Sequence, residues 1–170
     1  FHTEADLGRM LSHRGIVRAH ATYQFEEENW MAMDLVEGRS LESALRERAA
    51  AGRLPPLPMT MAVGLALLEV LRYCHTYEPS PGRLMTVIHG DVTPSNVLID
   101  TSGALKLIDF GIASTSALAE LYEERGVATK LQYMAPELYE DGVEANPLVD
   151  VYQTGIVLYE MLAGVRPFKA

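Results

Sequence analysis

The sequence predicts an α+β fold. Hydrophobic residues make up 48% of its 170 residues, which is enough for a packed core. Two long and nearly continuous apolar segments, residues 59–75 and 149–163, are typical of buried helices. Short apolar runs on both sides of turn residues, as in NVLID, TSGA and LKLID, are typical of paired strands.

Local patterns predict the elements that precede the first long helix. Residues 3–12 predict an amphipathic helix. The segment IVRAHATYQFEEENWMAMDLVEG predicts two strands that flank an acidic turn at residues 26–29. Ser40 is the predicted N-cap of a short helix that ends near Gly52.

The prolines and glycines of GRLPPLP and TYEPSPGRLMT predict loops before and after the helix over residues 59–75. Cys74 and His75, at the end of that helix, are expected in the core. Trp30 and the several methionines are expected there as well.

Composition excludes several classes of function. The formal net charge is −9 and no basic run occurs, so nucleic acid is not an expected partner. The single cysteine, Cys74, excludes a disulfide framework and favours a reducing compartment. The longest apolar run, residues 62–68, is too short to span a bilayer, so no membrane contact is expected within this segment. An excess of 11 arginines over 3 lysines favours a GC-rich, bacterial genome.

The hairpin predicted from NVLID and LKLID brings chemical groups to its open end. If the two runs pair as antiparallel strands, Val97 lies near Leu107. Asn96 and Asp109 then flank the open end and offer hard oxygen ligands, which suit Mg²⁺. Asp91 precedes Asn96 by five residues and is expected near the same end, within reach of a substrate hydroxyl. Each of the three could be an ordinary turn residue, but their joint spacing around one hairpin favours a site.

Several motifs occur in the order and spacing of one family. HGDVTPSN at residues 89–96 is similar to its catalytic loop, DFG at 109–111 to its metal-binding motif, and APE at 135–137 to the end of its activation segment. EADLGRMLSHRGIV resembles helix C and the next strand, WMAMDLVEGRSL the strand and hinge that hold adenine, and DVYQTGIVLYEMLAGVRPF the long helix F. The chain therefore resembles the eukaryotic-type, bacterial Hanks-type protein serine/threonine kinase catalytic domain.

The resemblance implies a bilobal fold that this segment covers in part. Residues 1–37 would form a partial N-lobe and hinge, and residues 38–170 most of a mainly helical C-lobe through helix F. The implied activity is transfer of the γ-phosphoryl group of ATP to Ser or Thr hydroxyls of proteins, with Mg²⁺. The sequence begins at Phe1 without a glycine-rich loop or its lysine, so we expect a fragment that is weak or inactive alone. The implied location is the cytoplasm, in a cytoplasmic protein or in the cytoplasmic domain of a membrane-anchored kinase.

The resemblance also implies catalytic and metal-binding roles. Asp91 would orient the substrate hydroxyl and accept its proton, mainly by positioning. Asn96 and Asp109 would hold Mg²⁺. His89 and Phe110 would stack in the hydrophobic spine.

Other positions match the nucleotide site and the support of the catalytic loop. Met33 would be the gatekeeper behind adenine, and backbone groups of Asp34 and Val36 would hydrogen-bond the base. Glu4 would pair with the N-lobe lysine. Asp150 would bond the backbone of the catalytic loop.

Two glycines depart from the family pattern. Gly8 falls where helix C normally has an apolar residue. Gly90 replaces the arginine of the family's HRD, which normally pairs with a phosphorylated residue of the activation loop. We therefore expect activity that does not require phosphate on the nearby hydroxyl residues, Ser114, Thr115, Ser116 and Thr129.

Thr93 and Lys130 form a third departure. Thr93 stands where serine/threonine kinases carry a lysine that touches the γ-phosphate, and Lys130 stands where the family usually has a threonine before YMAPE. We interpret the pair as an exchange, in which the Lys130 ammonium reaches a similar point from the opposite wall of the site. The alternative is that Lys130 is a solvated loop lysine.

Two other functions stay open. Aminoglycoside and choline phosphotransferases also carry HGD, but they lack an APE segment and a helix like DVYQTG. A pseudokinase scaffold is disfavoured because Asp91, Asn96 and Asp109 are all present. Pro94 favours a serine/threonine kinase over a tyrosine kinase, whose loop follows an alanine and arginine pattern.

Overall fold

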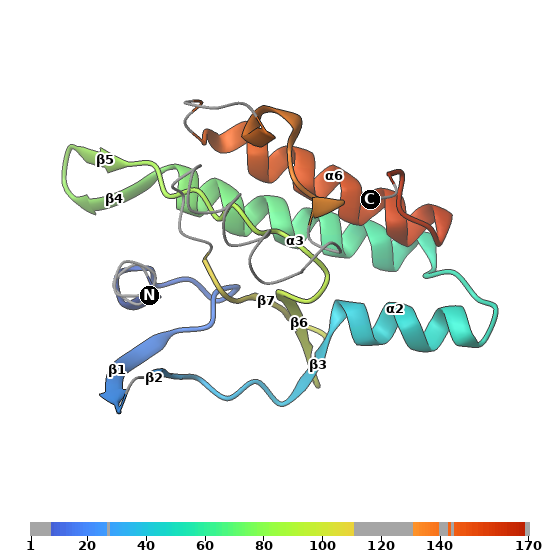
Figure 1. The fold of residues 1–170 in the computed structure, drawn as a ribbon, viewed down its shortest axis with the longest axis horizontal. Coiled ribbons are helices and arrows are strands. Elements are labelled where there is room, and N and C mark those ends of the chain that lie inside the picture. Colours follow the sequence, from blue (N-terminus) through green and yellow to red (C-terminus); the bar gives the residue numbers. More distant parts are fainter. Residues whose placement is uncertain (1–7, 27, 111–130, 140–142, 144, 169–170) are drawn as a thin grey trace.

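The computed structural model describes residues 8–26, 28–110, 131–139, 143 and 145–168 (Figure 1). Its elements in chain order are β1 (Ala19–Phe25), β2 (Glu28–Met33), β3 (Gly38–Ser40), α2 (Leu41–Ala50), α3 (Leu57–His75), β4 (Tyr77–Ser80), β5 (Arg83–Met85), β6 (Val97–Asp100), β7 (Leu105–Leu107), a 3₁₀ turn (Pro136–Tyr139) and α6 (Pro147–Ala163). Residues 8–10 are also helical. Helices combined with small antiparallel sheets are the α+β fold that the sequence predicts.

β1 and β2 pair antiparallel around the acidic turn, as predicted. Tyr23 lies opposite Trp30, and Glu26 in the turn has a left-handed φ of 56°. Trp30 is 57% exposed, so the expectation of a core position is wrong, because the described residues leave its face of this two-stranded sheet uncovered. The expectation that the methionines lie in the core is confirmed for Met134 and Met161, which are buried, and is wrong for Met10, Met33 and Met61, which are exposed.

β3, β6 and β7 form a second antiparallel sheet with β6 in the middle. Val97 lies opposite Leu107, which is the register that the sequence predicts. The N–H of Val17 donates to the Leu107 carbonyl oxygen at 3.0 Å, and the N–H of Leu107 donates to the Gly15 carbonyl oxygen at 2.8 Å. These bonds attach the chain before β1 to the hairpin.

The residues at the N-termini of α2 and α3 are types that favour the start of a helix. α2 follows its predicted N-cap, because the Ser40 hydroxyl accepts from the N–H of Ser43 at 3.2 Å. α3 begins at Leu57, two residues earlier than predicted, and Pro58 lies in its first turn. Proline fits there because the first helical N–H groups have no partner in the helix. The loop predicted from GRLPPLP is therefore shorter than expected.

The segment TYEPSPGRLMT was predicted to be a loop and forms a hairpin instead. β4 and β5 pair antiparallel, with Tyr77 opposite Met85, and the hairpin extends beyond the end of α3 (Figure 1). Gly82 in its turn has a φ of 78°, which costs glycine little because it has no Cβ. The residues that predicted a loop thus serve as the turn of a hairpin.

α3 and α6 lie side by side and supply much of the core (Figure 1). One side of each helix joins a continuous buried cluster that includes Leu67, Leu71, Val157 and Met161. The prediction of buried helices is wrong for their other sides. The apolar residues exposed there include Met61, Leu65 and Leu68 of α3 and Leu148, Val151 and Leu162 of α6.

α3 is long and apolar enough to cross a membrane by length and composition, and among the described helices it alone meets that test. Core helices of soluble proteins meet the same test, and α3 packs against α6 and β7. This feature is therefore weak evidence for a membrane span.

Candidate active site

α6 fixes the backbone of the HGDV stretch, residues 89–92. The N–H groups of His89 and Gly90 donate to the two carboxylate oxygens of Asp150, at 3.0 and 2.8 Å. Asp150 lies in the first turn of α6 and is fully buried. His75 Nε2 lies 2.7 Å from the same carboxylate. A buried carboxylate is costly unless donors surround it, and these three donors meet that requirement.

His75 and Gln153 belong to this support, although the sequence did not single them out for it. His75 was expected in the core, and it is half-buried at the end of α3, where it contacts Asp150. Gln153 is buried in α6 and bonds the same stretch of backbone. One signal could have found them, because a polar side chain inside an apolar helix needs a partner when it is buried.

Asn96 holds Asp91 by two hydrogen bonds. Its Nδ2 donates to the Asp91 carbonyl oxygen at 2.9 Å and to the Asp91 carboxylate at 2.8 Å. Its backbone N–H donates to the Thr93 carbonyl oxygen at 3.0 Å, which closes the loop. Both side chains are buried. Since the amide nitrogen is committed to Asp91, Oδ1 is the Asn96 atom left to meet a metal ion.

Asp109 follows the hairpin at its open end. The N–H of Ile108 donates to the Asn96 carbonyl oxygen at 3.0 Å, so the two predicted metal ligands leave the hairpin next to one another. Asp109 is exposed and has a left-handed φ of 55°, which aspartate tolerates better than most residues.

An amide oxygen and a carboxylate are hard donors, and Mg²⁺ takes one or two such ligands from a protein while phosphate and water supply the others. In the part of the chain that the structure describes, no group of three or more His, Cys, Asp or Glu side chains could hold a metal ion. Asn96 and Asp109 therefore fit Mg²⁺ only as a pair that a nucleotide completes.

His89 is fully buried, and its ring centroid lies 4.8 Å from that of Phe110. The two rings are in contact, but they are tilted by 49° and do not form the predicted stack. Burial lowers the pKa of His89, although the nearby carboxylates of Asp150 and Asp91 oppose this shift. The neutral ring suits both of its partners. Nε2 lies 3.0 Å from the Ile108 carbonyl oxygen, and Nδ1 accepts from the N–H of Asp91 at 3.2 Å. These partners assign the proton to Nε2.

Thr93 is buried, and its hydroxyl lies 2.8 Å from the Ser95 hydroxyl. The carbonyl oxygen of Pro94 accepts from the N–H of Glu42 at 2.9 Å, which ties the loop to the first turn of α2. Lys130, the predicted exchange partner of Thr93, lies outside the described residues. Residues 114–116 and 129 lie outside them as well. The exchange and the phosphate-independent activity therefore stay predictions.

Met33, the predicted gatekeeper, lies near Asp109, a predicted metal ligand. It lines a small cavity together with Asp109 and Phe110. Gly8 lines the same cavity, and a Cβ at this position would come within 2.9 Å of the Ala19 Cβ. Close packing of residues 8–10 on β1 thus accounts for the glycine that departs from the family pattern.

Asp34 begins the segment predicted to hold adenine. Its N–H donates to the Arg18 carbonyl oxygen at 3.0 Å, so its own carbonyl oxygen is the backbone group it can offer to a base. Its carboxylate lies 2.7 Å from His20 Nε2, and this hydrogen bond lowers the pKa of Asp34. Val36 is half-buried in the segment before β3. Glu4 lies outside the described residues, so its pairing stays a prediction.

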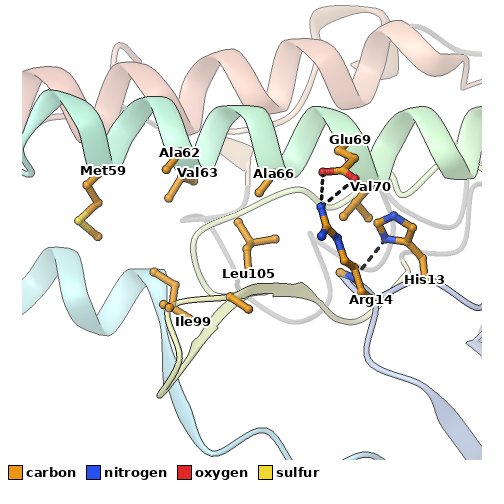
Figure 2. Close-up of a pocket in the computed structure, with 13 residues that line it drawn as sticks. His13, Arg14, Met59, Ala62, Val63, Ala66, Glu69, Val70, Ile99 and Leu105 are labelled. Carbon is orange, nitrogen blue, oxygen red and sulfur yellow. Dashed lines mark hydrogen bonds and ion pairs between the residues drawn. The ribbon is translucent and has the colours of Figure 1, made fainter.

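A cavity of about 560 Å³ lies elsewhere, between α3 and the β6–β7 hairpin (Figure 2). Its walls are mainly apolar and include Met59, Val63 and Leu105. At one end, Arg14 Nη2 lies 3.0 Å from the Glu69 carboxylate (Figure 2). None of the predicted site residues that the structure describes lines this cavity. The predicted catalytic and metal-binding side chains that the structure describes therefore lie at the catalytic-loop side of α6 and not at the apolar cavity.

A family model described as protein kinase domain matches residues 1–170. The chain is 31% identical over 169 residues to the tyrosine-protein kinase MasK of Myxococcus xanthus (strain DK1622), covering 99% of this chain and 26% of the relative. It is 32% identical over 168 residues to the serine/threonine-protein kinase PknL of Mycobacterium tuberculosis (strain ATCC 25618 / H37Rv), covering 99% and 39%. It is 34% identical over 173 residues to the serine/threonine-protein kinase PknA of Mycobacterium tuberculosis (strain ATCC 25177 / H37Ra), covering 99% and 37%. The chain thus spans 26 to 39% of the length of these relatives.

Proposed function

Because the chain belongs to the protein kinase domain family, we propose that the intact domain transfers the γ-phosphoryl group of ATP to Ser or Thr hydroxyls of proteins, with Mg²⁺. One observation carries the proposal. The Asp91 carboxylate is buried and held by Asn96, beside the hairpin end that bears Asp109. A carboxylate placed next to two hard oxygen donors is the arrangement that phosphoryl transfer to a hydroxyl requires.

In this proposal Asp91 orients the acceptor hydroxyl and takes its proton. Phosphoryl transfer has a loose transition state, so placement of the hydroxyl matters more than strong basicity. The Nδ2 of Asn96 directs one carboxylate oxygen of Asp91, and Asp150 fixes the backbone before it. Asn96 and Asp109 would hold Mg²⁺, which would neutralise charge on the phosphates when bound.

Serine and threonine are the proposed acceptors. Pro94 supports this choice, and PknL and PknA are named serine/threonine-protein kinases. MasK is named a tyrosine-protein kinase, so the acceptor residue needs its own measurement. The proposed location is the cytoplasm, because the unpaired thiol of Cys74 suits a reducing compartment.

The test uses the full-length protein with radiolabelled Mg·ATP and, in separate reactions, a protein acceptor and an aminoglycoside. We expect label on the protein acceptor, and acid hydrolysis should release phosphoserine or phosphothreonine. An Asp91→Ala preparation purified in the same way should transfer no label, which excludes a contaminating kinase. Label on the aminoglycoside alone, or phosphotyrosine alone, would overturn the proposal. Absence of transfer to any acceptor would support a scaffold role instead.

A further inference from the structure

Gln153 contacts the catalytic loop on both sides of Asp91. Its Oε1 accepts from the N–H of Val92 at 2.9 Å, and its Nε2 donates to the carbonyl oxygen of Gly90 at 2.8 Å. These two groups belong to the peptide units that precede and follow the Asp91 Cα atom. A single side chain therefore restrains both backbone dihedral angles of Asp91.

Asp150 and Gln153 divide the support of the loop between them. They lie three residues apart in α6, so they share one face of the helix. Asp150 binds the N–H groups of His89 and Gly90, which enter the loop. Gln153 binds the two peptide units of Asp91 itself. Removing Gln153 would thus take one restraint from each peptide unit of Asp91 and leave the contacts of Asp91 with His89 and Asn96, while the entry to the loop stays bound to Asp150.

The conformation of Gly90 makes this arrangement possible. Its φ is 75°, in the left-handed region that glycine adopts without a Cβ penalty. In this conformation its N–H meets Asp150 and its carbonyl oxygen meets Gln153. The loop is therefore held from α6 through backbone groups of Gly90, the glycine that departs from the HRD pattern.

From these contacts we propose that Gln153 is a positioning residue for phosphoryl transfer. It acts by fixing the backbone of Asp91. This inference rests on the proposed function. Gln153 is 2% exposed and Val92 is fully buried, so water cannot replace the lost bonds without rearrangement. A displacement of about 1 Å in a group that orients a reactant can lower turnover by about 100-fold.

The test compares three variants of the full-length protein. Gln153→Met keeps the length of the side chain and removes both hydrogen bonds. Gln153→Glu can mimic glutamine when the carboxyl is protonated, because it then has one donor and one acceptor, but it has no donor when ionised. Thr154→Val is the matched control, because Thr154 is equally buried and, within the described part of the chain, its hydroxyl bonds the Asp150 carbonyl oxygen of its own helix and no loop backbone.

We expect Gln153→Met to lower kcat by about 10-fold or more, with the KM for ATP within about twofold of wild type, because Gln153 contacts the loop and not a nucleotide. Gln153→Glu should regain turnover relative to wild type as the pH falls, and Gln153→Met should not. Thr154→Val should keep kcat within about twofold. Wild-type turnover by Gln153→Met, or an equal loss in Thr154→Val, would overturn the inference.

Amide hydrogen exchange separates a failure of this inference from a failure of the proposed function. In Gln153→Met the Val92 amide should exchange about fivefold faster or more, whereas the amides of His89 and Gly90 stay protected by Asp150. This readout needs no enzymatic activity. An unchanged Val92 amide would contradict the positioning role even if the wild-type protein transferred no phosphate.

Discussion

The amide nitrogen of Asn96 donates to the carboxylate of Asp91 at 2.8 Å and to the carbonyl oxygen of the same residue at 2.9 Å. One side chain thus positions the proposed proton acceptor and leaves its own oxygen for a metal ion. The same residue accepts from the N–H of Ile108, which connects Asp91 to the hairpin that bears Asp109. Orientation of the acceptor and metal binding are therefore coupled through Asn96.

Asn96→Asp tests this coupling, because it keeps an oxygen ligand and replaces the donor by a second carboxylate beside Asp91. Two carboxylates at this distance repel one another, so Asp91 should lose its orientation. We expect kcat of the full-length protein to fall by about 10-fold or more at pH 7.5. Asn146→Asp is the matched control, because Asn146 is the N-cap of α6, where aspartate serves equally well. Equal turnover in the two variants would refute the coupling.

Burial of His89 predicts a loss of stability at mildly acidic pH. Its pKa in the folded protein is lowered from the usual value of about 6.5, so the unfolded chain binds the proton more readily. The free energy of unfolding should therefore be highest above about pH 6.5 and fall as the pH drops from there toward the lowered pKa. Urea unfolding at pH 7.5, 6.5 and 5.5 measures this slope.

His89→Gln isolates the contribution of His89 to that slope, because glutamine does not titrate and can still donate to the Ile108 carbonyl oxygen. The slope should be smaller in His89→Gln than in the wild type. His20→Gln is the control, since His20 is exposed at the protein surface. A slope that His89→Gln leaves unchanged would assign the pH dependence to other groups.

Substitution by alanine should have opposite effects on the free energy of unfolding at Gly90 and at Gly155. Gly90→Ala should lower the free energy of unfolding by about 1 to 2 kcal/mol, because a Cβ is strained at a φ of 75°. Gly155 lies within α6, and among the described residues a Cβ there would meet no atom within 4 Å apart from its chain neighbours and the nearby backbone of its own helix. Gly155→Ala should therefore raise the free energy of unfolding, by up to about 1 kcal/mol. Urea denaturation of both variants checks the signs, and a Gly90→Ala protein as stable as wild type would contradict the strained turn.

Cys74 should be unreactive in the folded protein. It is fully buried at the end of α3, and burial raises the pKa of its thiol to about 12, so almost no thiolate is present near neutral pH. A disulfide reagent such as DTNB should leave Cys74 unlabelled in the native protein and should label it in denaturant, and Cys74 is the one cysteine of residues 1–170. Rapid labelling under native conditions would show that this end of α3 opens.

The sequence predicted the β6–β7 hairpin down to its register, because that information is local. Short apolar runs on both sides of a Thr-Ser-Gly turn specify the pair, and Val97 lies opposite Leu107. The position of Asp91 near the same end of the hairpin was predicted from its spacing of five residues to Asn96, whereas the hydrogen bonds between the two residues were not predicted. Local pattern and turn chemistry were therefore enough to assemble the centre of the site.

The sequence did not predict contacts between distant elements. His75 and Gln153 meet partners 75 and about 60 residues away. Their polar character inside apolar helices indicates that they need a partner, but nothing nearby in the sequence shows which residue that partner is. Exposure of Leu65 and Trp30 was missed for a related reason. An apolar pattern shows that a residue can be buried, but whether another element covers it depends on the tertiary arrangement.

The central claim is that phosphoryl transfer depends on the Asp91 carboxylate, which orients the acceptor hydroxyl and takes its proton. Its most direct test measures kcat and ATP affinity of the full-length protein with Asp91→Asn. Asp100→Asn is the matched control, because it removes a carboxylate from the end of β6, next to the exposed TSGA turn of the same hairpin. We predict that Asp91→Asn lowers kcat by about 100-fold or more and leaves the ATP dissociation constant within about threefold, while Asp100→Asn changes neither by more than about threefold. Turnover by Asp91→Asn equal to that of Asp100→Asn would contradict the account.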